Sequence, residues 1–305
     1  MIYITGDTHG GADVKKLVSR QVTDTLKKDD ILIICGDFGF IWDPKKEGRK
    51  EKPWLEWFEK MPWTTVFADG NHECFPRLYS YPEKEWNGGK VHVIRDNLLH
   101  LERGNIYTID GQKIYVMGGA SSHDKFHTPA YEGKGWWPEE LPNEEEYALS
   151  EANLNACGRE VDCIITHCLP TSLQQKLNKP DYKTDHLTDY LETIMHNTTY
   201  KHWYCGHYHE DTDLDNNISV VFKKVIPIYN SIGESDPIPG SPIYGKGTSV
   251  MFIWDGKETE GTIQVVYPWG LPTHKNEPVY DIRTYTMHMV NHVGEKEIKC
   301  RLTQF

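Results

Sequence analysis

The fold is decided by the stretch MIYITGDTHG, residues 1–10. Its apolar first half predicts a β-strand that begins at once, without the basic segment or the cleavage site of a signal peptide. Asp7 and His9 follow the strand directly and lie between Gly6 and Gly10. Side chains in this position lie at the carboxyl end of a strand, the edge at which open α/β sheets bind their ligands. We therefore expect Asp7 and His9 to belong to a site.

The same arrangement recurs four more times along the chain. Short apolar runs lead into Gly36-Asp37, Gly70-Asn71-His72-Glu73, Thr166-His167 and Gly206-His207-Tyr208-His209. The five motifs offer carboxylate, amide and imidazole side chains but no thiolate, a set that suits Mn, Fe or Zn. Taken singly, Asp7 or Asp37 is more often a turn or cap residue, and His167 an ordinary loop residue. Only the joint pattern indicates a metal centre.

Apolar runs alternate with helical patterns along the rest of the chain, which predicts a layered α/β architecture. The predicted helices cover 12–26, 54–61, 144–157 and 185–195. Strands are expected at 31–35, 64–68, 91–94, 106–109, 113–117, 161–166 and 202–205, followed by a hairpin of 251–254 and 262–267. We assign one domain to residues 1–270 and a C-terminal β-rich extension to residues 271–305.

Composition narrows the class of function. No apolar run reaches the roughly 18 residues of a membrane helix, and a formal net charge of −12 argues against extended binding to nucleic acid. The seven cysteines form no CxxC pair. Cys35, Cys163 and Cys205 lie in apolar runs, where a free thiol is most often a small buried hydrophobe. We therefore expect a cytoplasmic protein that does not enter a membrane.

In their order, the five motifs resemble those of the calcineurin-like metallophosphoesterase superfamily. The resemblance covers roughly residues 1–209 and implies a layered α/β/β/α sandwich, two packed mixed sheets flanked by helices, that holds two divalent metal ions. By this resemblance, one metal is held by Asp7, His9 and His209. The other is held by Asn71, His167 and His207, while Asp37 bridges the two. His72 stays off the metals and donates a proton to the leaving oxygen or steadies the phosphate, as a group that titrates near neutral pH can do.

The second motif departs from that of many relatives. Phosphoprotein phosphatases and dinucleotide polyphosphate hydrolases carry Gly-Asp-x-x-Asp-Arg at this place. Here Phe40 replaces the Asp that orients the catalytic histidine, and Ile41 replaces the Arg that grips phosphate. The same relatives have an Arg where this chain has Asp69. Two phosphate contacts are therefore missing, which argues against a protein phosphatase.

Other side chains must then hold the substrate. Arg77 follows the third motif, and a long polar segment from residue 121 to 142 contains His123 and Lys125. We predict these three residues as phosphate contacts, Lys125 as a point charge and Arg77 in bidentate fashion. An exposed loop charge explains each of them equally well. Trp136-Trp137, in the same segment, could cover the site or stack on a base, although packing is the simpler interpretation.

The leading interpretation is hydrolysis of a phosphate mono- or diester, on a small or nucleotide-like substrate, by a hydroxide that bridges two metal ions. A nuclease acting on DNA ends shares the metal motifs but needs a basic surface, which the sequence does not show. A third interpretation is a non-catalytic scaffold that uses the fold for protein contacts, but such relatives lose ligands that this chain retains. The C-terminal extension could mediate oligomerisation.

Overall fold

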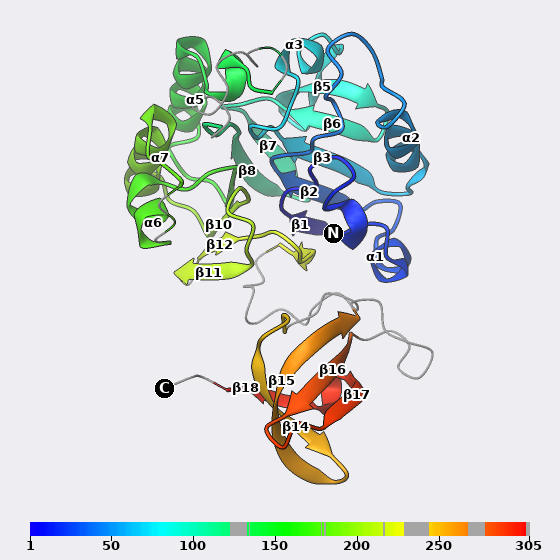
Figure 1. Ribbon diagram of the computed structural model, residues 1–305. Coiled ribbons are helices and arrows are strands. Elements are labelled where there is room, and N and C mark those ends of the chain that lie inside the picture. Colours follow the sequence, from blue (N-terminus) through cyan, green and yellow to red (C-terminus); the bar gives the residue numbers. More distant parts are fainter. Residues whose placement is uncertain are drawn as a thin grey trace. The chain divides into compact units, whose positions relative to one another are not determined.

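The computed structural model describes residues 1–122, 133, 135–177, 179, 181–215, 217–228, 244–267 and 278–302. The chain divides into two compact units: residues 1–15 with 26–235, and residues 16–25 with 236–305. Figure 1 shows the two sheets of the first unit with helices beside them, and the smaller sheet of the second unit.

A seven-stranded mixed sheet carries the first three motifs, in the strand order β13-β1-β2-β3-β6-β5-β4. Its parallel centre consists of β1 (Ile2–Thr5), β2 (Ile31–Cys35) and β3 (Thr64–Ala68). These strands are buried almost throughout, which explains why most of their residues are apolar. The other strands are β4 (Glu83–Trp86), β5 (Gly89–Arg95), β6 (Leu98–Leu101) and β13 (Ile226–Pro227).

A six-stranded mixed sheet carries the last two motifs, in the order β11-β12-β10-β9-β8-β7. The motifs follow β9 (Cys163–Thr166) and β10 (His202–Cys205), which are parallel neighbours and wholly buried. The other strands are β7 (Ile106–Ile109), β8 (Gln112–Met117), β11 (Thr212–Asp215) and β12 (Ile218–Val220).

The two sheets pack face to face, and helices cover their outer faces. Ile33 and Val66 of the first sheet share one core with Val116 and Ile165 of the second. On the far side of the six-stranded sheet, Trp203 packs in a core with the helices α5 (Glu144–Ala156), α6 (Thr171–Lys176) and α7 (His186–Asn197). The predicted α/β/β/α sandwich is confirmed.

An aromatic cluster attaches α2 (Lys52–Lys60) to the seven-stranded sheet. The ring of Phe58 lies 5.2 Å from that of Phe38, which in turn stacks on Phe67 of β3 at 4.3 Å. The shorter helices are α1 (Arg20–Thr25) and α3 (Phe75–Leu78), together with 3₁₀ turns at Val14–Lys16, Pro138–Glu140 and Glu295–Glu297.

The second unit has a core of its own. Its antiparallel sheet has the order β17-β16-β15-β14-β18, and Phe252, Ile263 and Tyr280 pack together on it. The strands are β14 (Ser249–Trp254), β15 (Lys257–Tyr267), β16 (Val279–Thr284), β17 (Met289–Gly294) and β18 (Ile298–Arg301).

The predicted domain boundary at residue 270 lies too far along the chain. The predicted hairpin of β14 and β15 is present, but β15 pairs with β16 and β14 pairs with β18. These hydrogen bonds and the shared core join the hairpin to the C-terminal strands, so the division falls between residues 235 and 236.

One further expectation differs from the structure, and some elements were not expected. The helix predicted over 12–26 is split into a 3₁₀ turn and α1, because the hydroxyl of Ser19 accepts a hydrogen bond from the backbone of Val22 at 3.2 Å. The strands β4 and β6 were not predicted.

All seven cysteines are free, and Cys35, Cys163 and Cys205 are buried. None of the described helices is long and apolar enough to cross a membrane.

Candidate metal centre

The five motifs meet where the two sheets present the carboxyl ends of their parallel strands. Side chains that follow β1, β2, β3, β9 and β10 form groups in which the potential ligand atoms lie within 4.8 Å of one another. The groups are Asp7 with His9 and His209, Asp37 with His167 and His207, and His9 with Asp37 and His72. The convergence on which the sequence argument depends is therefore present in the structure.

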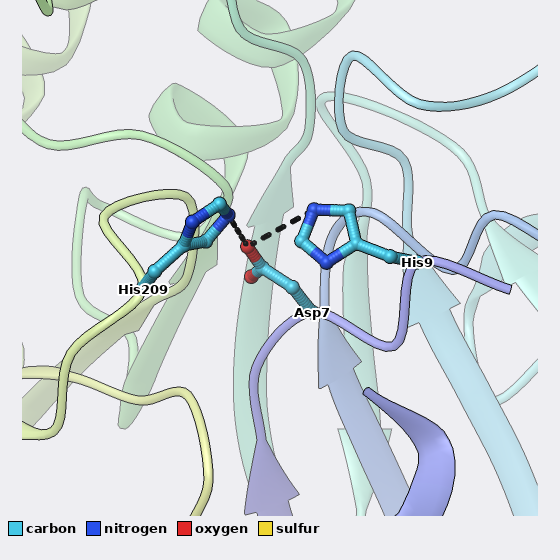
Figure 2. Close-up of side chains that lie close together, drawn as sticks. All are labelled: Asp7, His9 and His209. Atoms are coloured by element: carbon cyan, nitrogen blue, oxygen red, sulfur yellow. Dashed lines mark ion pairs between the residues drawn. The ribbon is translucent and has the colours of Figure 1, made fainter. Parts of the chain in front are cut away.

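The first group gathers around the carboxylate of Asp7 (Figure 2). Its Oδ2 atom lies 3.9 Å from Nε2 of His9 and 3.4 Å from Nε2 of His209. The other ring nitrogen of His9, Nδ1, lies 2.8 Å from a carboxylate oxygen of Asp13. A carboxylate on the far ring nitrogen fixes the orientation of a metal-binding histidine, so Asp13 is a positioning residue that sequence reasoning missed.

The second group gathers around His167. Its Nε2 atom lies 3.3 Å from Oδ1 of Asp37, and its ring lies 4.7 Å from that of His207. Its Nδ1 atom donates a hydrogen bond to the carbonyl oxygen of Cys35 at 2.8 Å, which leaves Nε2 to act as a ligand. The backbone of Asn71 donates to Oδ1 of Asp37 at 2.8 Å, so this residue also lies at the group.

Asp37 faces both groups. One of its oxygens, Oδ2, lies 3.1 Å from Nε2 of His9, and the other lies 3.3 Å from Nε2 of His167. The carboxylate is buried, with only 1% of the residue exposed. This is the placement that a carboxylate shared between two cations requires.

The backbone around the ligands is strained and closely packed. His9, Asp37, His207 and His209 have positive φ angles of 43°, 48°, 70° and 53°, a region that residues with a side chain rarely occupy and that often marks functional sites. Glycine is required next to them. A Cβ atom on Gly70 would lie 2.1 Å from Oδ1 of Asp37.

The electrostatics of the site favour bound cations. Burial raises the pKa of Asp37, but the positive charge of His167 outweighs it and holds that pKa well below its usual range. Burial lowers the pKa of His167, but the charge of Asp37 raises it to about 9. Among the described residues, Oδ1 of Asn71 and Nε2 of His167 are buried without a hydrogen-bond partner. Buried polar atoms in native proteins are rarely left unpaired, so these residues fit a metal site.

Comparison with known proteins agrees with this geometry. The family described as Calcineurin-like phosphoesterase matches residues 1–211, most of the chain. The chain belongs to the calcineurin-like phosphoesterase family. No curated protein matches it. Family membership assigns the chain to the hydrolases of phosphoester bonds, and its His and Asp clusters could hold the metal ions on which such enzymes typically depend.

His72 lies at the edge of the centre of this phosphoesterase. Its ring lies 5.1 Å from that of His9 and 6.0 Å from that of Trp42. Its backbone donates to Oδ1 of Asp37 at 2.9 Å, and no described residue hydrogen-bonds to its ring. Phe40, at the position of the relatives' orienting Asp, is buried against Phe58 at 5.5 Å. The catalytic role of His72 stays a prediction.

Of the three substrate contacts predicted for this phosphoesterase, the structure describes only Arg77, and this residue belongs to none of the candidate ligand groups. Arg77 is buried, and its Nη1 atom donates to Glu51 at 2.8 Å and to the carbonyl oxygen of Asp43 at 2.7 Å. This placement gives no support to a phosphate contact and indicates a structural role. His123 and Lys125 lie outside the described residues. Trp137 is buried and packs edge-on against Trp42 at 5.2 Å.

Asp69 occupies the place of the relatives' Arg but belongs to none of the candidate ligand groups. It is wholly buried, and it accepts a hydrogen bond from Nε of Arg103 at 2.8 Å. Nε2 of His100 lies 3.1 Å from its other oxygen. The position has thus become part of a buried network. No sequence signal could reveal it, because Arg103 belongs to no motif.

A cavity of about 740 Å³ opens beside the centre and is bordered by His9 and His72. Phe40, Trp42 and residues of the loop 43–51 line the rest. Sequence reasoning missed this loop because its charged residues follow no motif spacing.

Proposed function

We propose that this phosphoesterase hydrolyses a small or nucleotide-like phosphate mono- or diester with two divalent metal ions. The observation that carries the proposal is the carboxylate of Asp37, whose two oxygens face the two ligand groups separately. Two adjacent cations bound there would supply an activated water at neutral pH and neutralise the charge of the phosphoryl oxygens. Asp7, His9 and His209 would hold one cation, and Asn71, His167 and His207 the other.

The side chains around the centre divide the remaining tasks. His72 borders both the ligand groups and the cavity, so its ring would donate a proton to the leaving oxygen of a substrate bound there. Asp13 and the carbonyl of Cys35 hold the rings of His9 and His167 in the orientation that ligation needs. A cavity of about 740 Å³ is in the range of small-molecule sites, which supports a small substrate.

The test uses protein stripped of metal and reloaded with Mn, Fe or Zn. We expect hydrolysis of p-nitrophenyl phosphate, bis-p-nitrophenyl phosphate or both, only after metal is added. The ratio of the two rates separates a monoesterase from a diesterase. Asp37→Asn should lose metal at both positions, because one shared ligand serves both. Stoichiometric metal binding without turnover of any phosphate ester would instead favour the scaffold interpretation.

A further inference from the structure

The loop between the second motif and α2 forms one wall of the cavity beside the metal centre. It contributes Asp43, Lys45, Arg49 and Lys50, while His9 and His72 border the same cavity. A molecule in the cavity can therefore touch the loop and the centre together.

A buried ion pair fixes the shape of this loop. Oε2 of Glu51 lies 2.8 Å from Nη1 of Arg77, and both side chains are nearly inaccessible to solvent. The carboxylate of Glu51 also accepts hydrogen bonds from the backbone of Trp42, Asp43 and Gly48 at 2.6, 2.7 and 2.8 Å. These contacts tie the loop to a buried side chain, and a loop that is ordered in advance has a lower entropic cost of binding.

The cations that the loop presents to the cavity have no internal partner. Lys45, Arg49 and Lys50 are exposed, and none of them forms an ion pair with a described residue. The loop's own acids do not neutralise them, because Glu47 pairs with Arg95 and Glu51 pairs with Arg77. Among the loop residues that line the cavity, Asp43 is the one carboxylate outside these pairs, so three cations in the wall stand against one anion.

From this arrangement we infer that the loop 43–51 binds a second anionic group of the substrate, and that the substrate is a nucleotide with two or more phosphoryl groups. The inference rests on the proposed function, which locates the scissile phosphate at the metal centre. The chain carries a net charge of −12, and an unpaired basic loop within an acidic molecule attracts anions locally. The cations of the loop would also replace the two phosphate-binding arginines of relatives, at whose positions this chain has Ile41 and Asp69.

The dimensions and lining of the cavity favour a nucleotide over a free phosphate. A volume of about 740 Å³ far exceeds the needs of one phosphoryl group. Trp42 lines the cavity beside His72 and is partly exposed, so the wall contains aromatic surface that a base could contact. The chemistry of the wall is therefore cationic at the loop and aromatic next to the centre.

Binding of inorganic tripolyphosphate to the metal-free protein tests the loop without any need for catalysis. The test variant is Lys45→Gln/Arg49→Gln/Lys50→Gln, and the matched control is Lys28→Gln/Lys60→Gln/Lys84→Gln, which removes the same charge from exposed positions outside the cavity. By calorimetry we expect the test variant to bind at least about tenfold more weakly than the wild type. The control should bind within about twofold of the wild type. Equal weakening in both variants would overturn the inference, because it would reflect net charge alone.

Kinetics of the metal-loaded protein separate the two proposals. The loop variant should lower kcat/KM for ATP relative to kcat/KM for p-nitrophenyl phosphate by at least about tenfold, mostly through KM. An unchanged ratio would refute a second anion site while leaving the proposed hydrolysis intact. Absence of turnover with every ester and metal would refute the hydrolysis, and the tripolyphosphate measurement would still decide the role of the loop.

Discussion

At the scale of single residues, Asp13 sets the orientation of His9 through one contact of 2.8 Å. Loss of such a partner typically lowers metal affinity by about 10- to 100-fold. We therefore expect Asp13→Asn to weaken binding at the position that Asp7, His9 and His209 share. Titration of the metal-free protein with metal measures this affinity, and the variant Asp29→Asn, at an exposed position, is the control. An affinity equal to that of the wild type would remove Asp13 from the account of the centre.

His72 offers a different test, because its proposed role is proton donation. His72→Ala should lower turnover by roughly two to four orders of magnitude and leave the metal content unchanged. Steady-state kinetics and elemental analysis of the same preparation check both parts. His196→Ala, at an exposed position of α7, serves as the control. If metal is lost as well, His72 is a ligand, as its grouping with His9 and Asp37 permits.

The sequence was sufficient to identify residues that belong to short motifs but not residues that act through distant contacts. Asp7, Asp37 and His167 stand directly behind apolar runs, and parallel strands bring such positions to one edge. Arg103 reaches Asp69 across 34 residues of chain, and no local pattern encodes that contact. Arg77 shows the reverse error: a cation near a motif was taken for a ligand contact, although it is buried against Glu51.

At the scale of elements, the ion pair between Arg77 of α3 and Glu51 of the loop 43–51 contributes to the free energy of unfolding. Arg77→Met leaves the carboxylate of Glu51 buried without its cation, which typically costs about 3–5 kcal/mol. Urea unfolding should show a loss of that order. The double variant Glu51→Gln/Arg77→Met should recover part of it, because no buried charge is left. No recovery in the double variant would mean that the packing of Arg77, and not its charge, holds the loop.

Strands were predictable from the sequence where both of their faces are buried, because buried positions carry mostly apolar residues. β2, with the sequence ILIIC, is a continuous apolar run, and β3, with the sequence TTVFA, ends in one; both strands are buried almost throughout. β4, with the sequence EKEW, is mostly exposed at the edge of its sheet, so it carries no apolar signal. The domain boundary differs for a related reason: the sequence shows the hairpin of β14 and β15 but not that β15 pairs with β16, a strand that lies later in the chain.

At the scale of the whole molecule, His92 links stability to pH. It is 4% exposed, and its ring stacks on Tyr79 at 5.6 Å. Burial, with a further contribution from the charge of His100, lowers the pKa of His92 to about 4. Between pH 6.5 and 4 the unfolded chain therefore binds more protons at this residue than the folded chain. The stability that His92 contributes is complete above pH 6.5 and is lost as the pH falls towards 4.

The free energy of unfolding, measured by urea titration from pH 7 to 4, tests this linkage. Glu102 opposes it, because burial raises its pKa to about 7 and its contribution improves as the pH falls. The comparison is therefore between the wild type and His92→Phe, which keeps an aromatic ring against Tyr79. We expect their difference to shift by up to about 3 kcal/mol across this range. A difference that is independent of pH would show that His92 titrates normally in the folded protein.

The separation between the strained ligand positions and the exposed cations of the loop has a practical consequence. Side chains such as Asp37 are confined by neighbouring glycines that accept no added atom, so almost any change there is harmful. Lys45, Arg49 and Lys50 are exposed on a loop that is clamped from behind by Glu51 and Arg77. If the loop binds the substrate as we infer, substitutions at these three positions would alter selectivity without altering the metal ligands. A library restricted to those three codons could redirect the enzyme to new esters while its chemical step is inherited unchanged.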